Sequence, residues 1–279
     1  MFPVPPLVVP LSQDSNVNEW LIYLALGAFA GTLAGLLGVG GGLIIVPVLA
    51  WSFARHGIDH GVIMHLAVGT SLTTIVFTSL SSVRAHHRHG AVRWQAFRQL
   101  VPGIVVGAWL GAAVADLLPT SAMRVVFGVF ELVVAVQMGF ALLPEGHREL
   151  PARLGMALAG TVIGGVSAVI GIGGGTLTVP FLVWCNVSMR EAVATSAATG
   201  LPIALAGAVG FVVTGWSAAA LPPNAVGYLY LPALAGIVAT SILFAPLGAR
   251  LAHTLPTRAL KRFFALLLAL LGLRMLLMS

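Results

Sequence analysis

The chain has 279 residues, of which 58% are hydrophobic and only 8% are charged. So few charged side chains cannot solvate a water-soluble domain of this size, and soluble enzymes and soluble binding domains are therefore excluded. The formal net charge of +6 does not indicate a nucleic-acid partner, because the basic residues lie in short loops beside apolar segments, where they orient a protein in a lipid bilayer.

Residues 1–18 are predicted to form an exposed N-terminal tail. They contain four prolines and neither Lys nor Arg, so they do not resemble a signal peptide. The rest of the chain contains long unbroken apolar runs, which favour helices over the alternating pattern of a barrel. We expect an all-α polytopic membrane protein with about ten helices. Their predicted ranges are 20–37, 43–54, 62–83, 97–117, 121–143, 152–170, 176–187, 189–214, 226–250 and 258–278.

Local signals predict where several of these helices begin. Ser188 with Glu191 has the spacing of a capping box, in which a serine hydroxyl and a glutamate satisfy the first backbone N–H groups. Thr120 and Thr257 each follow a proline, and we expect them to be N-caps.

One unusual segment occurs twice. Residues 38–49 and 171–182 share the pattern Gly-x-Gly-Gly-Gly-x-x-x-Val-Pro-x-Leu, and in each half an Ala-Val-x-Thr-Ser sequence follows, at 67–71 and 192–196. The chain is therefore an internal duplication. We expect a first membrane repeat over 19–146 and a second over 147–279.

The distribution of charge predicts that the second repeat is inverted in the membrane. The loop after the third helix of the first repeat carries four arginines, whereas its counterpart, residues 215–227, carries no charge. Ten spans with both termini outside leave only Arg55, Arg124 and Arg274 outside, as the positive-inside rule requires. We therefore expect two inverted five-helix repeats.

The glycine turns are the candidate binding site. The helix after each turn is only about 12 residues, or ~18 Å, long, against a hydrocarbon core of ~30 Å, so each turn must lie below the membrane surface. Successive glycines expose backbone N–H groups that, with the helix dipole, favour an anion. In an inverted fold the two turns approach one another. The predicted substrate-binding residues are Gly40, Gly41, Gly42, Thr70, Ser71, Gly173, Gly174, Gly175, Thr176, Thr195 and Ser196.

A structural interpretation of these residues stays open. Glycines also permit close helix packing, and hydroxyls also bond back to their own helix. The paired arrangement favours the site interpretation, because interrupted helices at matching places in two halves are typical of transporter binding sites.

The doubled glycine motif and the Thr-Ser sequence downstream resemble the TauE/SafE family, also called the toluene-sulfonate uptake permease family. The resemblance covers nearly the whole chain beyond residue 18. It implies a bacterial inner-membrane permease for sulfur-containing anions such as sulfite, sulfoacetate or other organosulfonates, often working as an exporter. It does not select one substrate within the family.

Glu131 lies in the middle of an apolar helix, where a charged carboxylate costs at least ~2.5 kcal/mol. It is either a proton-coupling carboxylate or part of a polar contact between helices. The counterpart in the second repeat is Leu268. Protons are thus a candidate co-substrate.

No metal or other cofactor is expected. The cluster of His86, His87 and His89 lies among arginines with no Cys or carboxylate nearby. An intramembrane enzyme lacks support, because neither His-Glu-x-x-His nor Gly-x-Ser-x-Gly occurs. The expected function is a secondary anion transporter with alternating access; a passive anion channel, or an importer of another small organic anion, is the alternative. A homodimer is compatible with the sequence.

Overall fold

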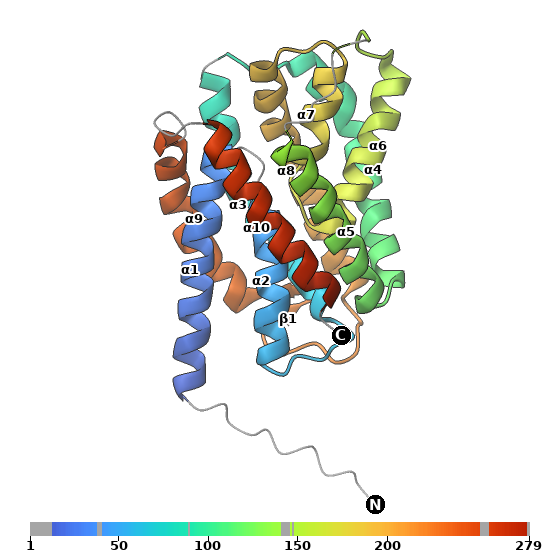
Figure 1. Ribbon diagram of the computed structural model, residues 1–279. Helices are drawn as coiled ribbons and strands as arrows, with labels where there is room; N and C mark the ends of the chain where they lie inside the picture. Colours follow the sequence, from blue (N-terminus) through green and yellow to red (C-terminus); the bar gives the residue numbers. More distant parts are fainter. Residues whose placement is uncertain are drawn as a thin grey trace, which may run out of the picture.

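The computed structural model describes residues 13–37, 41–88, 90–140, 146, 148–251 and 257–277 (Figure 1). The described chain is almost entirely helical, as predicted. Its helices are α1 (Gln13–Leu37), α2 (Gly42–Arg55), α3 (Ile63–Arg88), α4 (Trp94–Leu117), α5 (Thr120–Gly139), α6 (Arg153–Ile170), α7 (Gly175–Trp184), α8 (Met189–Thr214), α9 (Leu231–Leu251) and α10 (Thr257–Leu277). The all-α polytopic fold is confirmed.

Six of the described helices, α1, α3, α4, α5, α6 and α8, are long and apolar enough to cross a membrane. Large apolar side chains on the outer helices are exposed, including Val106 and Leu110 of α4 and Leu266 of α10. Exposed apolar surface of this extent is unstable in water but stable against lipid tails. The molecule is therefore a multi-pass membrane protein.

Equivalent helices of the two repeats run antiparallel. In the α3–α8 pair, Gly207 lies against Leu72 while Gly200 lies against Ser79, so one helix descends as the other rises. In the α5–α10 pair, Gly128 packs against Leu276, and Gly139 packs against Ala265. Figure 1 shows the same relation between α1 and α6, whose chains run in opposite directions. The inverted repeats predicted from charge are thus present in the fold.

Two other helix pairs pack closely and parallel. In the α4–α6 pair, a Cβ at Gly103 would collide with the carbonyl oxygen of Ala157, and one at Gly107 with that of Thr161. The repeat-related pair, α1 with α9, has the same kind of contact between Gly248 and the carbonyl of Thr32. Such close backbone approach is how helices associate in a membrane, where no hydrophobic force drives them together.

The fold differs from expectation at several places. The third helix, predicted to end at 83, ends at Arg88. The helix predicted from 226 begins at Leu231, because a hairpin of β1 (Ala225–Val226) and β2 (Leu229–Tyr230) precedes it. The first helix begins at Gln13, inside the expected tail. Thr120 is not an N-cap: Pro119 occupies that position, and the Thr120 hydroxyl donates to the Gly61 carbonyl oxygen at 2.8 Å.

The predicted N-cap at Ser188 is confirmed. Its hydroxyl accepts from the N–H of Glu191 at 3.4 Å and donates to the Glu191 carboxylate at 2.7 Å. The side chain of Thr257 lies outside the described residues.

Candidate functional site

The two glycine turns meet, although 129 positions separate Gly42 from Gly171. A Cβ at Gly42 would collide with the carbonyl oxygen of Gly171 and would lie 3.0 Å from the Cα of Ile172. Gly171 has a φ of +82°, the left-handed conformation that only glycine adopts readily. Gly41 and Gly174 have negative φ, which other residues also adopt. At these two positions it is therefore the close approach of neighbouring atoms, and not the backbone conformation, that favours glycine.

The meeting point lies against two membrane helices, α3 and α8, well inside their ends. The hydroxyl of Ser71, in the first half of α3, donates to the Gly171 carbonyl oxygen at 2.8 Å, and both groups are buried. A Cβ at Gly174 would lie 3.1 Å from the hydroxyl oxygen of Thr199, midway along α8. The helices that begin at the turns, α2 and α7, have 14 and 10 residues. At 1.5 Å per residue they are ~21 Å and ~15 Å long, less than the ~30 Å of a hydrocarbon core.

The second turn presents polar groups without partners. Among the described residues, no backbone carbonyl accepts from the N–H groups of Gly173, Gly174 or Thr176. The buried hydroxyl of Thr176 has no hydrogen-bond partner either. Free N–H and O–H groups at the start of a helix are what an oxyanion requires, because each can donate to a negatively charged oxygen.

Ser196 adds a second buried hydroxyl without a partner. It corresponds in the internal repeat to Ser71, whose acceptor is Gly171. The position corresponding to Gly171 in the first repeat is Gly38, which, like the predicted site residue Gly40, lies outside the described residues. Thr199, one turn along α8, donates to the Ser196 carbonyl at 2.9 Å. Its hydroxyl also lies 3.4 Å from that of Thr178.

Thr70 and Thr195 occupy equivalent structural positions. The hydroxyl of Thr70 accepts from the N–H of Tyr230, immediately before α9, at 3.0 Å. The hydroxyl of Thr195 accepts from the N–H of Arg93, immediately before α4, at 2.9 Å. Each threonine therefore fixes the start of a helix in the repeat-related position. That they also bind substrate stays a prediction.

We expect Thr70→Val to lower stability without a specific loss of substrate affinity. Valine keeps the shape of threonine but leaves the N–H of Tyr230 unpaired, which costs about 1–3 kcal/mol. Thermal unfolding in detergent measures this loss. Thr73→Val is the matched control, because the Thr73 hydroxyl only bonds back to Gly69 of its own helix. Equal unfolding temperatures for both variants would contradict the structural role of Thr70.

Glu131 is fully buried, and neither carboxylate oxygen has a hydrogen-bond partner. It lies on the face of α5 that packs against α10, with its Cβ close to Gly272. The structure therefore shows no polar contact between helices at Glu131, which was one of the two interpretations of this residue. Leu268, its counterpart, is also fully buried, so the second repeat has an apolar side chain where the first has a carboxyl group.

Sequence reasoning missed a buried network at the end of the molecule where α2 ends and α3 begins. Glu19 accepts from the hydroxyls of Tyr23 at 2.6 Å and Tyr230 at 3.2 Å. Nearby, the Tyr228 hydroxyl donates to Asp116 at 2.9 Å. Burial and the Asp116 carboxylate raise the pKa of Tyr228 to about 12, so this phenol stays protonated. No sequence motif links these residues.

No group of three or more metal-ligating side chains occurs within the described part of the chain. The side chains of His86, His87 and His89 fall outside it.

This fold and site define a multi-pass membrane protein built from inverted repeats, with two interrupted helices meeting between the repeats. Many transporters are built in this way, with the substrate site near the interface between the repeats. Residues 23–275 match the family described as "Sulfite exporter TauE/SafE", and the chain belongs to that family. The resemblance inferred from the doubled glycine motif is confirmed.

Relatives from several organisms cover almost the whole chain. A "Probable membrane transporter protein" of Haemophilus influenzae is 35% identical over 91% of this chain and 97% of its own length. The "Probable membrane transporter protein YunE" of Bacillus subtilis is 27% identical over 91% of this chain and 96% of its own. No solved structure matches the chain significantly.

Proposed function

We propose that this protein is a secondary transporter that exports sulfur-containing anions, such as sulfite or organosulfonates like sulfoacetate, across the bacterial inner membrane by alternating access. The observation that carries this proposal is the meeting of the two glycine turns. At the second turn, the N–H groups of Gly173, Gly174 and Thr176 and the hydroxyl of Thr176 are free to donate. The family name supports sulfite and related anions as the substrate class.

The chemistry of the turn suits a small oxyanion. Sulfite and sulfonate groups carry three oxygen atoms that accept hydrogen bonds in several directions, which matches several converging donors. Hydrogen bonds to a charged acceptor are about twice as strong as neutral ones. The helix dipole of α7 adds a partial positive charge, so no Arg or Lys is needed inside the membrane.

The inverted repeats supply the mechanism. Because α3 and α8 are equivalent and antiparallel, the two repeats can exchange conformations, which closes one side of the site and opens the other. Pro202 in α8 has Phe77 as its counterpart in α3, so the two halves are not mechanically equivalent. We assign the larger movement to the half that contains α8, because proline removes one hydrogen bond from the helix.

Removal of the unpartnered hydroxyls tests the proposal. We expect Thr176→Val and Ser196→Ala to fold normally, because neither hydroxyl has a protein partner to lose. The KM for the transported anion should rise about 10- to 100-fold, the equivalent of a hydrogen bond of about 1.5–3 kcal/mol to a charged group. Uptake into proteoliposomes measures it, with sulfite, thiosulfate, sulfoacetate, sulfate and simple carboxylates as the panel.

Thr161→Val is the matched control, because the Thr161 hydroxyl bonds to Ala157 of its own helix and lies away from the turns. An unchanged KM in both site variants would remove these hydroxyls from the site. Flux that does not saturate with concentration and ignores a pH gradient would identify a passive channel instead.

A further inference from the structure

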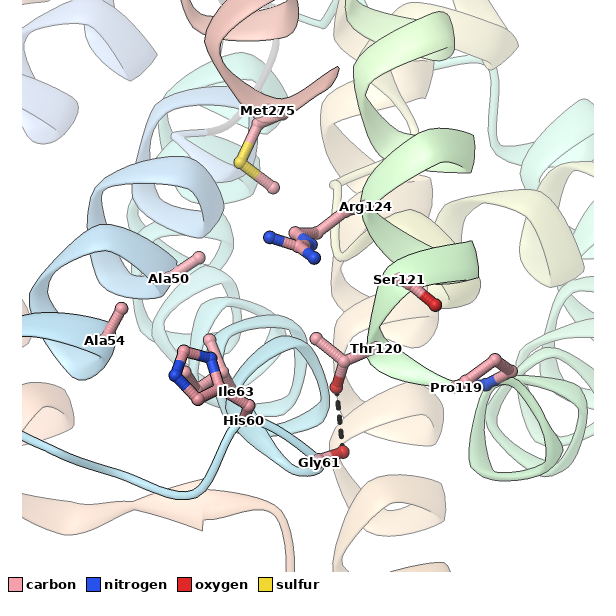
Figure 2. A pocket seen from close by; sticks show the side chains of 10 residues that line it. All are labelled: Ala50, Ala54, His60, Gly61, Ile63, Pro119, Thr120, Ser121, Arg124 and Met275. Atoms are coloured by element: carbon pink, nitrogen blue, oxygen red, sulfur yellow. Dashed lines mark hydrogen bonds between the residues drawn. The ribbon is translucent and has the colours of Figure 1, made fainter. Parts of the chain in front are cut away.

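A cavity lies at the end of the molecule where α2 and α10 finish and α5 begins. It has a volume of about 320 Å³ and is lined by α2, α5, α10, the first residue of α3 and the residues just before it (Figure 2). The lining side chains of α2 are Ala50 and Ala54. Ala50, the nearer of the two to the turns, lies eight residues beyond Gly42, or ~12 Å along α2, so this cavity is separate from the glycine turns.

Arg124 points into this cavity. Figure 2 shows its guanidinium extending from α5 toward α2, with His60 and Met275 on the other walls. Among the residues that the structure describes, none forms an ion pair, a hydrogen bond or a ring contact with the Arg124 side chain. A half-buried guanidinium with five N–H donors and no protein partner is available for an anion.

Two further arginines are neighbours in the sequence of residues that line the cavity. Arg55 follows the lining residue Ala54, and Arg274 precedes the lining residue Met275; both guanidinium groups stack on the ring of Trp51, at 5.1 Å and 5.4 Å. The aromatic ring holds the two cations in place without neutralising them. Arg55 of α2 and Arg274 of α10 thus meet at Trp51. Together with Arg124, which lines the cavity, they are the three basic residues predicted on the outer side.

Few negative charges oppose this cluster. No lining residue is acidic. Asp59 is exposed and accepts from the N–H of Gly61 at the edge of the cavity, and Asp116 accepts from Tyr228. The first turn of α5 adds donors: its N-cap, Pro119, provides no side-chain oxygen, so the N–H groups of the first turn are free to face an anion.

We propose that this cavity, with Arg124 as its principal ligand, is an anion-binding site at the mouth of the molecule, which takes a sulfonate, sulfate or phosphate group. The group belongs either to a small solute or to a lipid headgroup, since both present the same oxygen atoms. The sequence supports a role for the cation: the equivalent Leu-Pro-Thr segment of the second repeat carries Lys261 at the position of Arg124. The site stands independently of which anion, if any, the glycine turns transport.

Charge-selective labelling of a cysteine in the cavity tests the proposal. In a Cys185→Ala background, which removes the native thiol, Ser121→Cys places a thiol on the cavity wall. The protein is reconstituted into nanodiscs of phosphatidylcholine and labelled with an anionic sulfonatoethyl or a cationic trimethylammonium-ethyl methanethiosulfonate. At Ser121→Cys, we expect the rate of labelling by the anionic reagent, divided by the rate with the cationic reagent, to be about tenfold higher than at Ser217→Cys. Ser217 is an exposed control position in the loop after α8.

Arg124→Gln should bring the ratio down to that of the control, whereas Arg124→Lys should keep most of it. High salt should lower the ratio as well, because the attraction is electrostatic. Ala54→Cys samples the opposite wall and should give the same result, which keeps the test valid if one cysteine variant folds poorly. A ratio equal to that at Ser217→Cys, or one that Arg124→Gln does not change, would overturn the proposal.

Competition identifies the source of the anionic group. If a solute occupies the site, sulfate or sulfoacetate slows anionic labelling at Ser121→Cys in phosphatidylcholine nanodiscs. If a lipid headgroup occupies it, phosphatidylglycerol in the nanodisc slows labelling several-fold and the solutes have no effect. Either result supports the site; failure of both competitors, together with a control-like ratio, rejects it.

Discussion

Gly42→Ala is expected to abolish transport, because it forces the two glycine turns apart. The added methyl group would collide with the carbonyl oxygen of Gly171, which is backbone and cannot turn away as a flexible side chain can. The same carbonyl accepts the hydroxyl of Ser71, so any shift also strains that bond. Overpacking of this kind costs about 1–3 kcal/mol, and a displacement of ~1 Å in a binding site can reduce its activity about 100-fold.

Thermal unfolding and proteoliposome uptake measure the two effects separately. Gly165→Ala is the matched control: it adds the same methyl group to a membrane helix, but its Cβ would lie 3.4 Å from the Gly107 carbonyl, an ordinary contact. We expect the control to resemble the wild type. Normal transport by a folded Gly42→Ala protein would show that the meeting of the turns has no part in transport.

The second large effect is expected at Glu131. Its replacement by leucine should raise the stability of the protein but remove the coupling of transport to protons. Burial of a polar group without a hydrogen bond costs about 1–3 kcal/mol in proteins. Glu131→Leu installs the residue that the second repeat carries at this position, so we expect the free energy of unfolding to rise by about that amount. An ionisable residue that lies inside a membrane helix at a cost in stability is a candidate for function.

Transport by the same variants should lose its response to a proton gradient. Glu131→Leu and Glu131→Gln cannot bind and release a proton, so anion flux should become independent of the pH difference across the proteoliposome membrane. Glu131→Asp should retain the response, because it keeps a titratable carboxyl group. Wild-type coupling in Glu131→Gln would remove the proton role, and a lower stability of Glu131→Leu would show instead that the carboxyl group holds the helices together.

Much of the fold could be predicted from the sequence because hydropathy is a local property. Apolar runs located the helices from α2 to α8 and α10 closely, and the capping box placed the start of α8 at its true residue. Prediction failed where a non-local contact decided the structure. The hairpin before α9 is held by the bond between Tyr230 and Thr70, which are 160 positions apart, and the Thr120 hydroxyl bonds to Gly61 rather than to its own helix.

The candidate site was predictable only in part. The doubled glycine motif indicated both turns, and the charge asymmetry predicted that they enter from opposite sides. The sequence could not show that Thr70 and Thr195 fix the starts of other helices, or that the hydroxyls of Thr176 and Ser196 have no hydrogen-bond partners. Whether such a hydroxyl has a partner depends on which residues of the other repeat pack against it.

The sequence by itself therefore determined the class of protein, the duplication and the inversion, since composition, repetition and loop charge are properties of the chain that survive without coordinates. Only the tertiary structure decided which groups meet: Gly42 with Gly171, Ser71 with the carbonyl it binds, and Arg124 with a cavity built by three helices. The physical reason is that helix packing brings together residues that lie 100 or more positions apart, and no pattern along the chain records which pairs will touch.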